Sequence, residues 1–172
     1  VVYTKNGDYS AILRMENPVQ KYSANIDSYY EFTQLFTAVC QTLGEGYAIH
    51  KQDVFTRKQF KDESADKHEF LSEAYFRYYQ GREYTDSSTY LTITQENKKS
   101  TLFSFDHKKW RDLMVKVRKV HDQLKDAGVK ASFLGKQEAQ EYVDRFFAMN
   151  FRDKTVSMTG FKVDEETIGM GD

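Results

Sequence analysis

The sequence predicts an α+β domain with a ferredoxin-like, mainly antiparallel split βαβ sheet. Two observations predict this class. Stretches with strand character alternate with stretches of helical periodicity along the 172 residues. The strands carry polar residues at many positions, as in "AIHKQDVF" and "YLTITQ", whereas strands buried on both faces of a parallel sheet read as continuous apolar runs. We therefore expect helices on one face of the sheet, with one helix inserted between the two central strands.

The first part of the chain predicts a hairpin, a helix and a strand. "VVYTKNGDYSAILRM" (1–15) has two β-rich runs around Asn6-Gly7, a favoured dipeptide for a two-residue turn. Residues 23–46 predict a helix that is capped by Ser23 or Asn25 and ended by Gly44. Helical spacing predicts one inward face for it, made of Ile26, Tyr29, Tyr30, Thr33, Phe36, Cys40 and Leu43. "GYAIHKQDVFT" (46–56) has the length and composition of a strand.

The second part begins with a helix, "HEFLSEAYFRYYQGR" (68–82), broken near Gly81, and a strand, "SSTYLTITQ" (87–95). The clearest element is the next helix, from about 107 to 127, which Asp106 caps and Gly128 ends. Its apolar stripe consists of Trp110, Leu113, Met114, Val117, Val120, His121 and Leu124.

A short strand (129–134), a fourth helix (136–150) and a last strand (155–163) complete the prediction. The inward residues of the fourth helix are expected to be Ala139, Tyr142, Val143, Phe146 and Phe147.

Composition limits the functions that the chain can have. The 25 basic and 26 acidic residues nearly cancel, so no overall field attracts nucleic acid or an anionic membrane. The single Cys excludes an internal disulfide framework. No apolar run approaches the roughly 20 residues of a membrane helix. The sequence begins with Val and both ends stop in mid-pattern, so we expect residues 1–172 to be one domain cut from a longer protein.

Gly135-Lys136, in "KASFLGKQEAQE", occupies the place of a phosphate-binding loop at a helix start. A phosphate loop needs a Gly five residues before this one and a Ser or Thr after the Lys. Lys130 and Gln137 stand at these positions. The pair therefore predicts a strand end and a helix start, and no cofactor-binding residue.

Catalytic and metal-binding patterns are missing from the sequence. The four histidines are scattered without ligand spacing, and His121 falls within an apolar stripe. Cys40 is expected to be a small buried side chain. The acidic clusters "KDESAD" and "DEE" are typical of solvated loops. We expect no catalytic, metal or cofactor residue in this chain.

A nuclease of the relaxase kind is an alternative suggested by two tyrosine pairs, Tyr29-Tyr30 and Tyr78-Tyr79. Such enzymes attack DNA with a tyrosine hydroxyl on a ferredoxin-like sheet, and they need two histidines on one strand to hold a metal. "AIHKQDVF" offers only His50.

A surface that binds nucleic acid or anionic membranes is the second alternative. The helix at 107–127 places five basic residues on its outer side, with Asp112, Asp122 and Asp126 among them; the five are Lys108, Arg111, Arg118, Lys119 and Lys125. Lys109 and Lys116 lie at the margins. Mixed signs are typical of a solvated helix face.

Several longer strings resemble a known family. "KNGDYSAILRMENP", "YAIHKQDVF", "FLSEAYFRYYQGREY" and "YLTITQ", in this order, are similar to the N-terminal region of TraG-type conjugative-transposon ATPases of the Bacteroides group. These ATPases are relatives of the motors of type IV secretion. The similarity covers nearly the whole chain and rests on length and order, not on a short chemical motif.

The resemblance implies a cytoplasmic ATPase, peripheral to the inner membrane, whose N-terminal domain precedes a motor domain that binds ATP and Mg²⁺. The fragment itself would be a non-catalytic docking domain. Its implied partners are inner-membrane conjugation components, neighbouring ATPase subunits and its own motor domain, with direct DNA contact left open. The expected contact set joins the five basic residues of 107–127 with the exposed aromatics Phe76 and Tyr79.

Overall fold

The computed structural model describes residues 2–3, 7–23, 25–61, 70–97, 106–151, 161–163 and 168–170. Within these ranges the elements are β1 (Val2–Tyr3), β2 (Tyr9–Met15), α1 (Val19–Tyr22), α2 (Ile26–Leu43), β3 (Tyr47–Gln59), α3 (Phe70–Tyr79), β4 (Glu83–Gln95), α4 (His107–Asp126), β5 (Ala131–Phe133), α5 (Lys136–Phe147), β6 (Phe161–Val163) and β7 (Ile168–Met170). The predicted α+β class is confirmed.

The main sheet has the strand order of a ferredoxin-like fold. Its strands lie in the order β5–β2–β4–β3, and each neighbouring pair is antiparallel. β1 pairs with the start of β2, with Tyr3 opposite Tyr9, which confirms the first predicted hairpin; Asn6 of its turn lies outside the described residues. β6 and β7 form a separate pair. β6 falls within the last predicted strand, of which residues 155–160 lie outside the described ranges.

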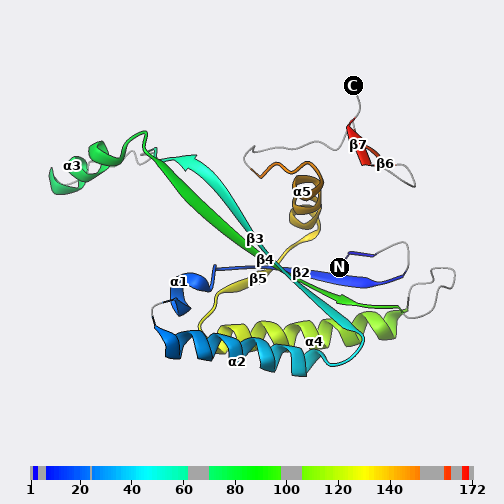
Figure 1. Cartoon of the computed structure of the whole chain (residues 1–172). Helices are drawn as coiled ribbons and strands as arrows, with labels where there is room; N and C mark the ends of the chain where they lie inside the picture. Colours follow the sequence, from blue (N-terminus) through cyan, green and yellow to red (C-terminus); the bar gives the residue numbers. More distant parts are fainter. Residues whose placement is uncertain are drawn as a thin grey trace.

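The helices divide between the two faces of the sheet. α2 and α4 lie beneath one face and α5 lies on the other (Figure 1). Successive residues of β2 point to opposite faces, so Leu13 packs in the core between the sheet and α4, whereas Ile12 packs against Ala139 and Tyr142 of α5. The prediction of helices on one face is therefore wrong for α5, because the second face of β2 also carries an apolar side chain that needs cover.

The main core lies between the sheet and the helix pair α2–α4. Leu13 and Leu91 are opposite each other on β2 and β4, and both are fully buried. α4 contributes the fully buried residues of its predicted stripe, namely Leu113, Val117, Val120 and Leu124. Of the other residues predicted in this stripe, Trp110 is exposed, whereas Met114 and His121 are half-buried; His121 Nε2 is 3.1 Å from the carbonyl oxygen of Ala131. Each fully buried Leu or Val side chain contributes about 1.5–3 kcal/mol.

The ends of the two long helices agree with the predicted capping residues. The Asn25 side chain accepts a hydrogen bond from the Ser28 amide, and α2 stops before Gly44, which has φ of 69°. Asp106 accepts hydrogen bonds from the amides of Lys108 and Lys109 at the start of α4.

α5 begins as the Gly135-Lys136 pair predicted. The Gly135 amide donates a 2.7 Å hydrogen bond to Glu138 Oε2, which satisfies one amide at the start of the helix. At the other end of α5, Phe146 and Phe147, predicted to point inward, are both exposed by more than a third.

The inward face of α2 differs from the prediction. Val39 and Leu43 are buried and Phe32, Leu35 and Phe36 are half-buried, whereas Ile26, Tyr29, Tyr30, Thr33 and Cys40 are exposed. The helix is turned by about one residue from the predicted orientation. Two adjacent stripes of α2 are free of charge, so hydrophobic spacing did not distinguish them, and contact with the sheet and α4 selected one.

β3 and β4 form a hairpin longer than predicted. All thirteen residues of β3 pair with β4, from Tyr47 opposite Gln95 to Gln59 opposite Glu83. The hairpin extends past the helices, and α3 lies at its tip (Figure 1). The predicted insertion between the two strands is confirmed, but only β4 is central. β3 is an edge strand, which the alternation of elements did not reveal.

Candidate interaction surfaces

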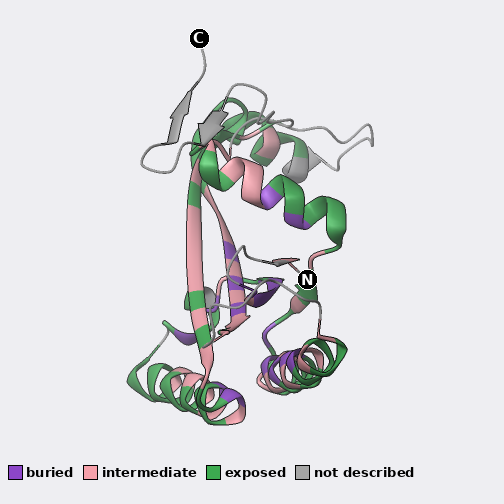
Figure 2. Cartoon of the chain, turned by 90° about the vertical axis from the view of Figure 1, so that its right-hand side faces the viewer, coloured by how far each residue is buried: buried purple, intermediate pink, exposed green. Residues whose placement is uncertain are grey.

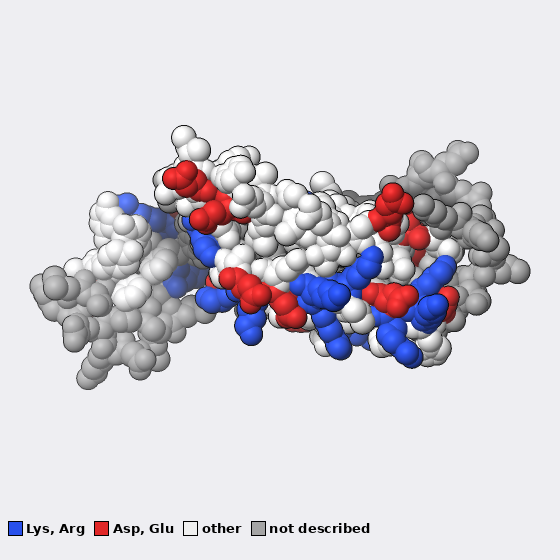
Figure 3. Space-filling model, turned by 90° about the horizontal axis from the view of Figure 1, so that it is seen from below, with Lys and Arg blue, Asp and Glu red and all other residues white. Residues whose placement is uncertain are grey.

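The five predicted basic residues of α4 are exposed on one side of the helix, from Lys108 to Lys125. Figure 3 shows them as a row of blue side chains broken by red ones. The marginal lysines have structural contacts: Lys109 Nζ donates to Asn97 Oδ1 at 3.1 Å, and Lys116 Nζ donates to the Leu43 carbonyl and lies 4.2 Å from the centre of the Tyr47 ring. The outer side of α4 is therefore exposed and mixed in sign.

The tip of the hairpin carries a group of aromatic side chains and one arginine around α3. We call this group the tip cluster: Phe60, Tyr75, Phe76, Tyr78, Tyr79 and Arg82. Phe60 stacks on Phe76 with ring centres 5.9 Å apart, and this half-buries Phe76. The Arg82 guanidinium lies 3.6 Å from the centre of the Tyr78 ring, a cation–π contact.

The most exposed rings of the tip cluster are not the two predicted from the sequence. Tyr75 and Tyr78 are 58% and 57% exposed, against 37% for Tyr79. Helical spacing could have found them, because Tyr75, Tyr78 and Tyr79 lie three and four positions apart and form one surface of α3. Phe60 and Arg82 come from the strand ends, so only the closed hairpin brings them to this cluster.

The two halves of the predicted contact set do not form one surface. Phe76 and Tyr79 lie on α3 at the tip of the hairpin, whereas the basic residues lie on α4, which runs beneath the sheet and apart from the tip (Figure 1). A partner would have to meet them as two separate sites.

The outer side of α2 is a third surface, which the sequence reasoning placed in the core. From Phe32 to Leu43 the helix has no charged residue. In Figure 3 the region over α2 is largely white, next to the charged row of α4. The exposed residues of this stretch are Thr33, Gln34, Thr37, Cys40 and Gln41, so the surface is uncharged but largely polar.

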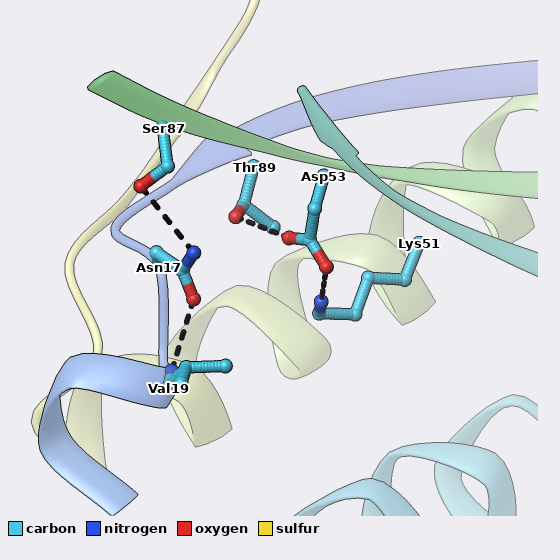
Figure 4. A network of polar contacts seen from close by, with 6 residues as sticks. All are labelled: Asn17, Val19, Lys51, Asp53, Ser87 and Thr89. Atoms are coloured by element: carbon cyan, nitrogen blue, oxygen red, sulfur yellow. Dashed lines mark hydrogen bonds and ion pairs between the residues drawn. The ribbon is translucent and has the colours of Figure 1, made fainter. Parts of the chain in front are cut away.

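A polar network ties β3 to β4 at the point where the hairpin leaves the body (Figure 4). The buried Thr89 hydroxyl donates to Asp53 Oδ1 at 2.6 Å, and the Lys51 ammonium donates to Asp53 Oδ2. Beside this pair, the Asn17 side chain donates to Ser87 Oγ at 3.4 Å and accepts from the Val19 amide. The group fixes the base of the hairpin.

Asp53 is ionised throughout the neutral range. Partial burial acts to raise its pKa, but the hydrogen bonds from Lys51 and Thr89 and the Lys51 charge outweigh burial and hold the pKa below its ordinary value. A carboxylate held in its charged form by two donors is suited to a structural role and not to accepting a proton during a reaction.

A polar groove of about 270 Å³ lies between the hairpin and α5. The Tyr142 hydroxyl at its wall donates to Gln52 Oε1, and burial raises the Tyr142 pKa above its ordinary value. Lys58 pairs with Asp86 across the strands. These contacts connect α5 to the hairpin and assemble no nucleophile with a base.

The fold does not bring together the tyrosines and the histidine on which the nuclease alternative depends. His50 lies on the α5 face, in a shallow apolar groove with Phe146 and Phe147. Tyr29 and Tyr30 lie on α2 beneath the opposite face, and the second tyrosine pair belongs to the tip cluster. Within the ranges that the structure describes, no three His, Cys, Asp or Glu side chains are grouped to hold a metal ion. None of the described helices is both long and apolar enough to cross a membrane.

Comparisons with protein-family models and with curated proteins find no match to this chain.

Proposed function

We propose that this chain is the non-catalytic N-terminal docking domain of a conjugation ATPase of the type IV secretion kind, and that it links the ATP-driven motor to the inner-membrane DNA-transfer complex. The family part of the proposal rests on the resemblance of the four strings. The docking part rests on one observation: an aromatic cluster with an arginine stands exposed at the end of a hairpin that projects from the body.

The chemistry of the tip cluster supports docking. Tyr and Arg are enriched among the residues that carry most of the binding energy at protein interfaces, because each combines large contact area with a polar group. The ring contacts of Tyr78 with Arg82 and Tyr79 hold these side chains in place before a partner arrives, so little conformational entropy is lost on binding. A projecting site can enter a recess of a partner without a clash between the two bodies.

The parent protein sets the location and cofactors in this proposal. It is cytoplasmic and peripheral to the inner membrane, and ATP and Mg²⁺ bind in its motor domain. The tip cluster contacts an inner-membrane component or a neighbouring ATPase subunit.

The direct test replaces Tyr75 and Tyr78 with Ala in the full-length parent. We expect DNA transfer to fall by at least about tenfold, and the parent to co-purify less with the inner-membrane complex, since a hot-spot residue contributes about 2 kcal/mol or more. ATP hydrolysis by the motor should persist. Val19→Ala is the control, because Val19 is a similarly exposed side chain on α1, outside the tip cluster and the surfaces of α2 and α4. Unchanged transfer and co-purification in the double variant would refute docking through the tip.

A second variant separates the basic side of α4 from the tip. It changes Lys108, Arg111, Arg118 and Lys119 to Glu. If these residues bind DNA or anionic vesicles, the wild-type domain should bind either ligand with strong salt dependence and the variant should not. If the tip alone docks the domain, transfer should survive this change.

A further inference from the structure

β3 is a long edge strand of the main sheet. Among the described strands it pairs only with β4, along thirteen residues without a bulge. None of its thirteen residues is buried, and Figure 2 shows it coloured only as intermediate and exposed. Proteins usually shorten, bend or cover such edges, because a row of unpaired backbone groups is a template for another strand.

The hydrogen bonds at the two ends of the hairpin show which residues of β3 face outward. The Glu96 amide donates to the Gly46 carbonyl, and the Phe60 amide donates to the Arg82 carbonyl. Even-numbered residues are thus bonded to the partner strand, and because the ladder is continuous, the N–H and C=O groups of the odd-numbered residues from 47 to 59 point away from the sheet. A further strand could pair with all of them.

The sequence of β3 is complementary to itself in one antiparallel register. When Gln52 lies opposite Gln52 of a second copy, Lys51 of each copy lies opposite Asp53 of the other. Ile49 then faces Phe55, and Tyr47 faces Arg57. These are a charge pair, an apolar pair and a cation–aromatic pair, each of a kind that stabilises adjacent strands. Phe55, which is 65% exposed, gains an apolar neighbour.

The uncharged side of α2 lies next to this edge. Thr42 Oγ1 accepts a 2.8 Å hydrogen bond from Gln123 Nε2, so that side of α2 faces α4. Thr33 and Cys40 are turned by about half a rotation from Thr42, so they face away from α4. Figure 2 places α2 beneath the β3 side of the sheet. A twofold axis perpendicular to the sheet keeps both copies of α2 on one face, so their uncharged sides would approach each other.

We infer that two copies of this chain pair through β3, antiparallel and about a twofold axis at Gln52, to form one continuous sheet. The sides of the two α2 helices that carry Thr33 and Cys40 lie next to the same axis. The interface is isologous, as in most homodimers, and each copy contributes the same strand and helix. This dimer is independent of the docking proposed for the tip cluster.

A cysteine placed on the axis tests the register. Residues opposite each other without hydrogen bonds have Cα atoms about 4.5 Å apart, which suits a disulfide. In a Cys40→Ala background, Gln52→Cys should form a disulfide-linked dimer under mild oxidation. His50→Cys and Val54→Cys are matched controls: each should stay largely uncrosslinked by itself, but a mixture of the two should crosslink, because residue 50 lies opposite residue 54.

A proline variant tests the dimer without cysteine chemistry. Arg57→Pro removes an outward N–H that β4 does not use, so the fold should persist by circular dichroism. Light scattering should show a dimer for the unmodified chain at about 100 μM, above the micromolar dissociation constants of specific association, and a monomer for Arg57→Pro. A monomeric unmodified chain, or His50→Cys crosslinking to itself as fast as Gln52→Cys, would overturn the inference.

Discussion

Thr89 on β4 lies opposite Asp53 on β3, and its hydroxyl donates a 2.6 Å hydrogen bond to the Asp53 carboxylate. Thr89 is the most deeply buried polar residue among those described, with no exposed surface. Its hydroxyl requires an acceptor, and Asp53 supplies one at the level where the hairpin leaves the core. The hydrogen bond therefore satisfies a buried hydroxyl of the body and also holds the base of the projecting hairpin in place.

Asp53→Asn should lower the free energy of unfolding at pH 7 by about 1.5–3 kcal/mol, the range for hydrogen bonds to a charged group. Because the folded-state pKa of Asp53 is depressed, its contribution is present above the unfolded-state value of about 3.9 and is lost as the pH falls through the folded-state pKa. Urea unfolding from pH 7 to pH 2 should show wild type and variant converging at acid pH. A constant difference across this range would contradict the account.

Leu91→Ala should lower the free energy of unfolding by about 2–5 kcal/mol, because it opens a cavity opposite Leu13 in the fully buried centre of the sheet. Val115→Ala, on the exposed side of α4, is the comparison and should change stability by less than about 0.5 kcal/mol. Chemical denaturation of the two variants measures both values. Equal effects would mean that the core is not where β2 meets β4.

Asp106→Ala should lower the free energy of unfolding by about 1 kcal/mol, because two amides at the start of α4 lose their acceptor. Asp106→Asn keeps the acceptor but removes the charge, so it should recover most of the loss, apart from the few tenths that the helix dipole contributes. Thermal unfolding by circular dichroism distinguishes the two variants. Identical losses in both would assign the effect to charge and not to capping.

Gly128→Ala should destabilise the fold by about 1 kcal/mol or more. Gly128 has φ of 71°, and an added Cβ would lie 2.6 Å from the Lys21 ammonium nitrogen, which donates to the Ala127 carbonyl. Gly81→Ala, at φ of 76° with open space around it, isolates the backbone part of the cost. Because the Lys21 ammonium is the far end of a flexible side chain, the excess at Gly128 over Gly81, measured by urea unfolding, should be small; a large excess would mean that Lys21 is held rigidly against Ala127.

The sequence alone determined the features that depend on neighbouring residues. Asn25 and Gly44 bound α2, and Asp106 and Gly128 bound α4, because capping and left-handed backbone involve atoms within a few positions of each other. The α+β class with an antiparallel sheet was also predictable, since the alternation of elements and the polar strands leave few arrangements, but the place of β3 at the edge was not. The exposure of the basic side of α4 followed from one strongly amphipathic helix.

The tertiary structure decided which of two similar surfaces is buried. α2 has two adjacent uncharged sides, and only packing against the sheet and α4 selected Phe32 and Val39 over Tyr29 and Cys40. It also placed α5 on the second face of the sheet, and it made β3 an edge strand that pairs with β4 along its whole length. These outcomes depend on contacts between residues far apart in the chain, whose free energies are set by shape and burial and leave no local pattern in the sequence.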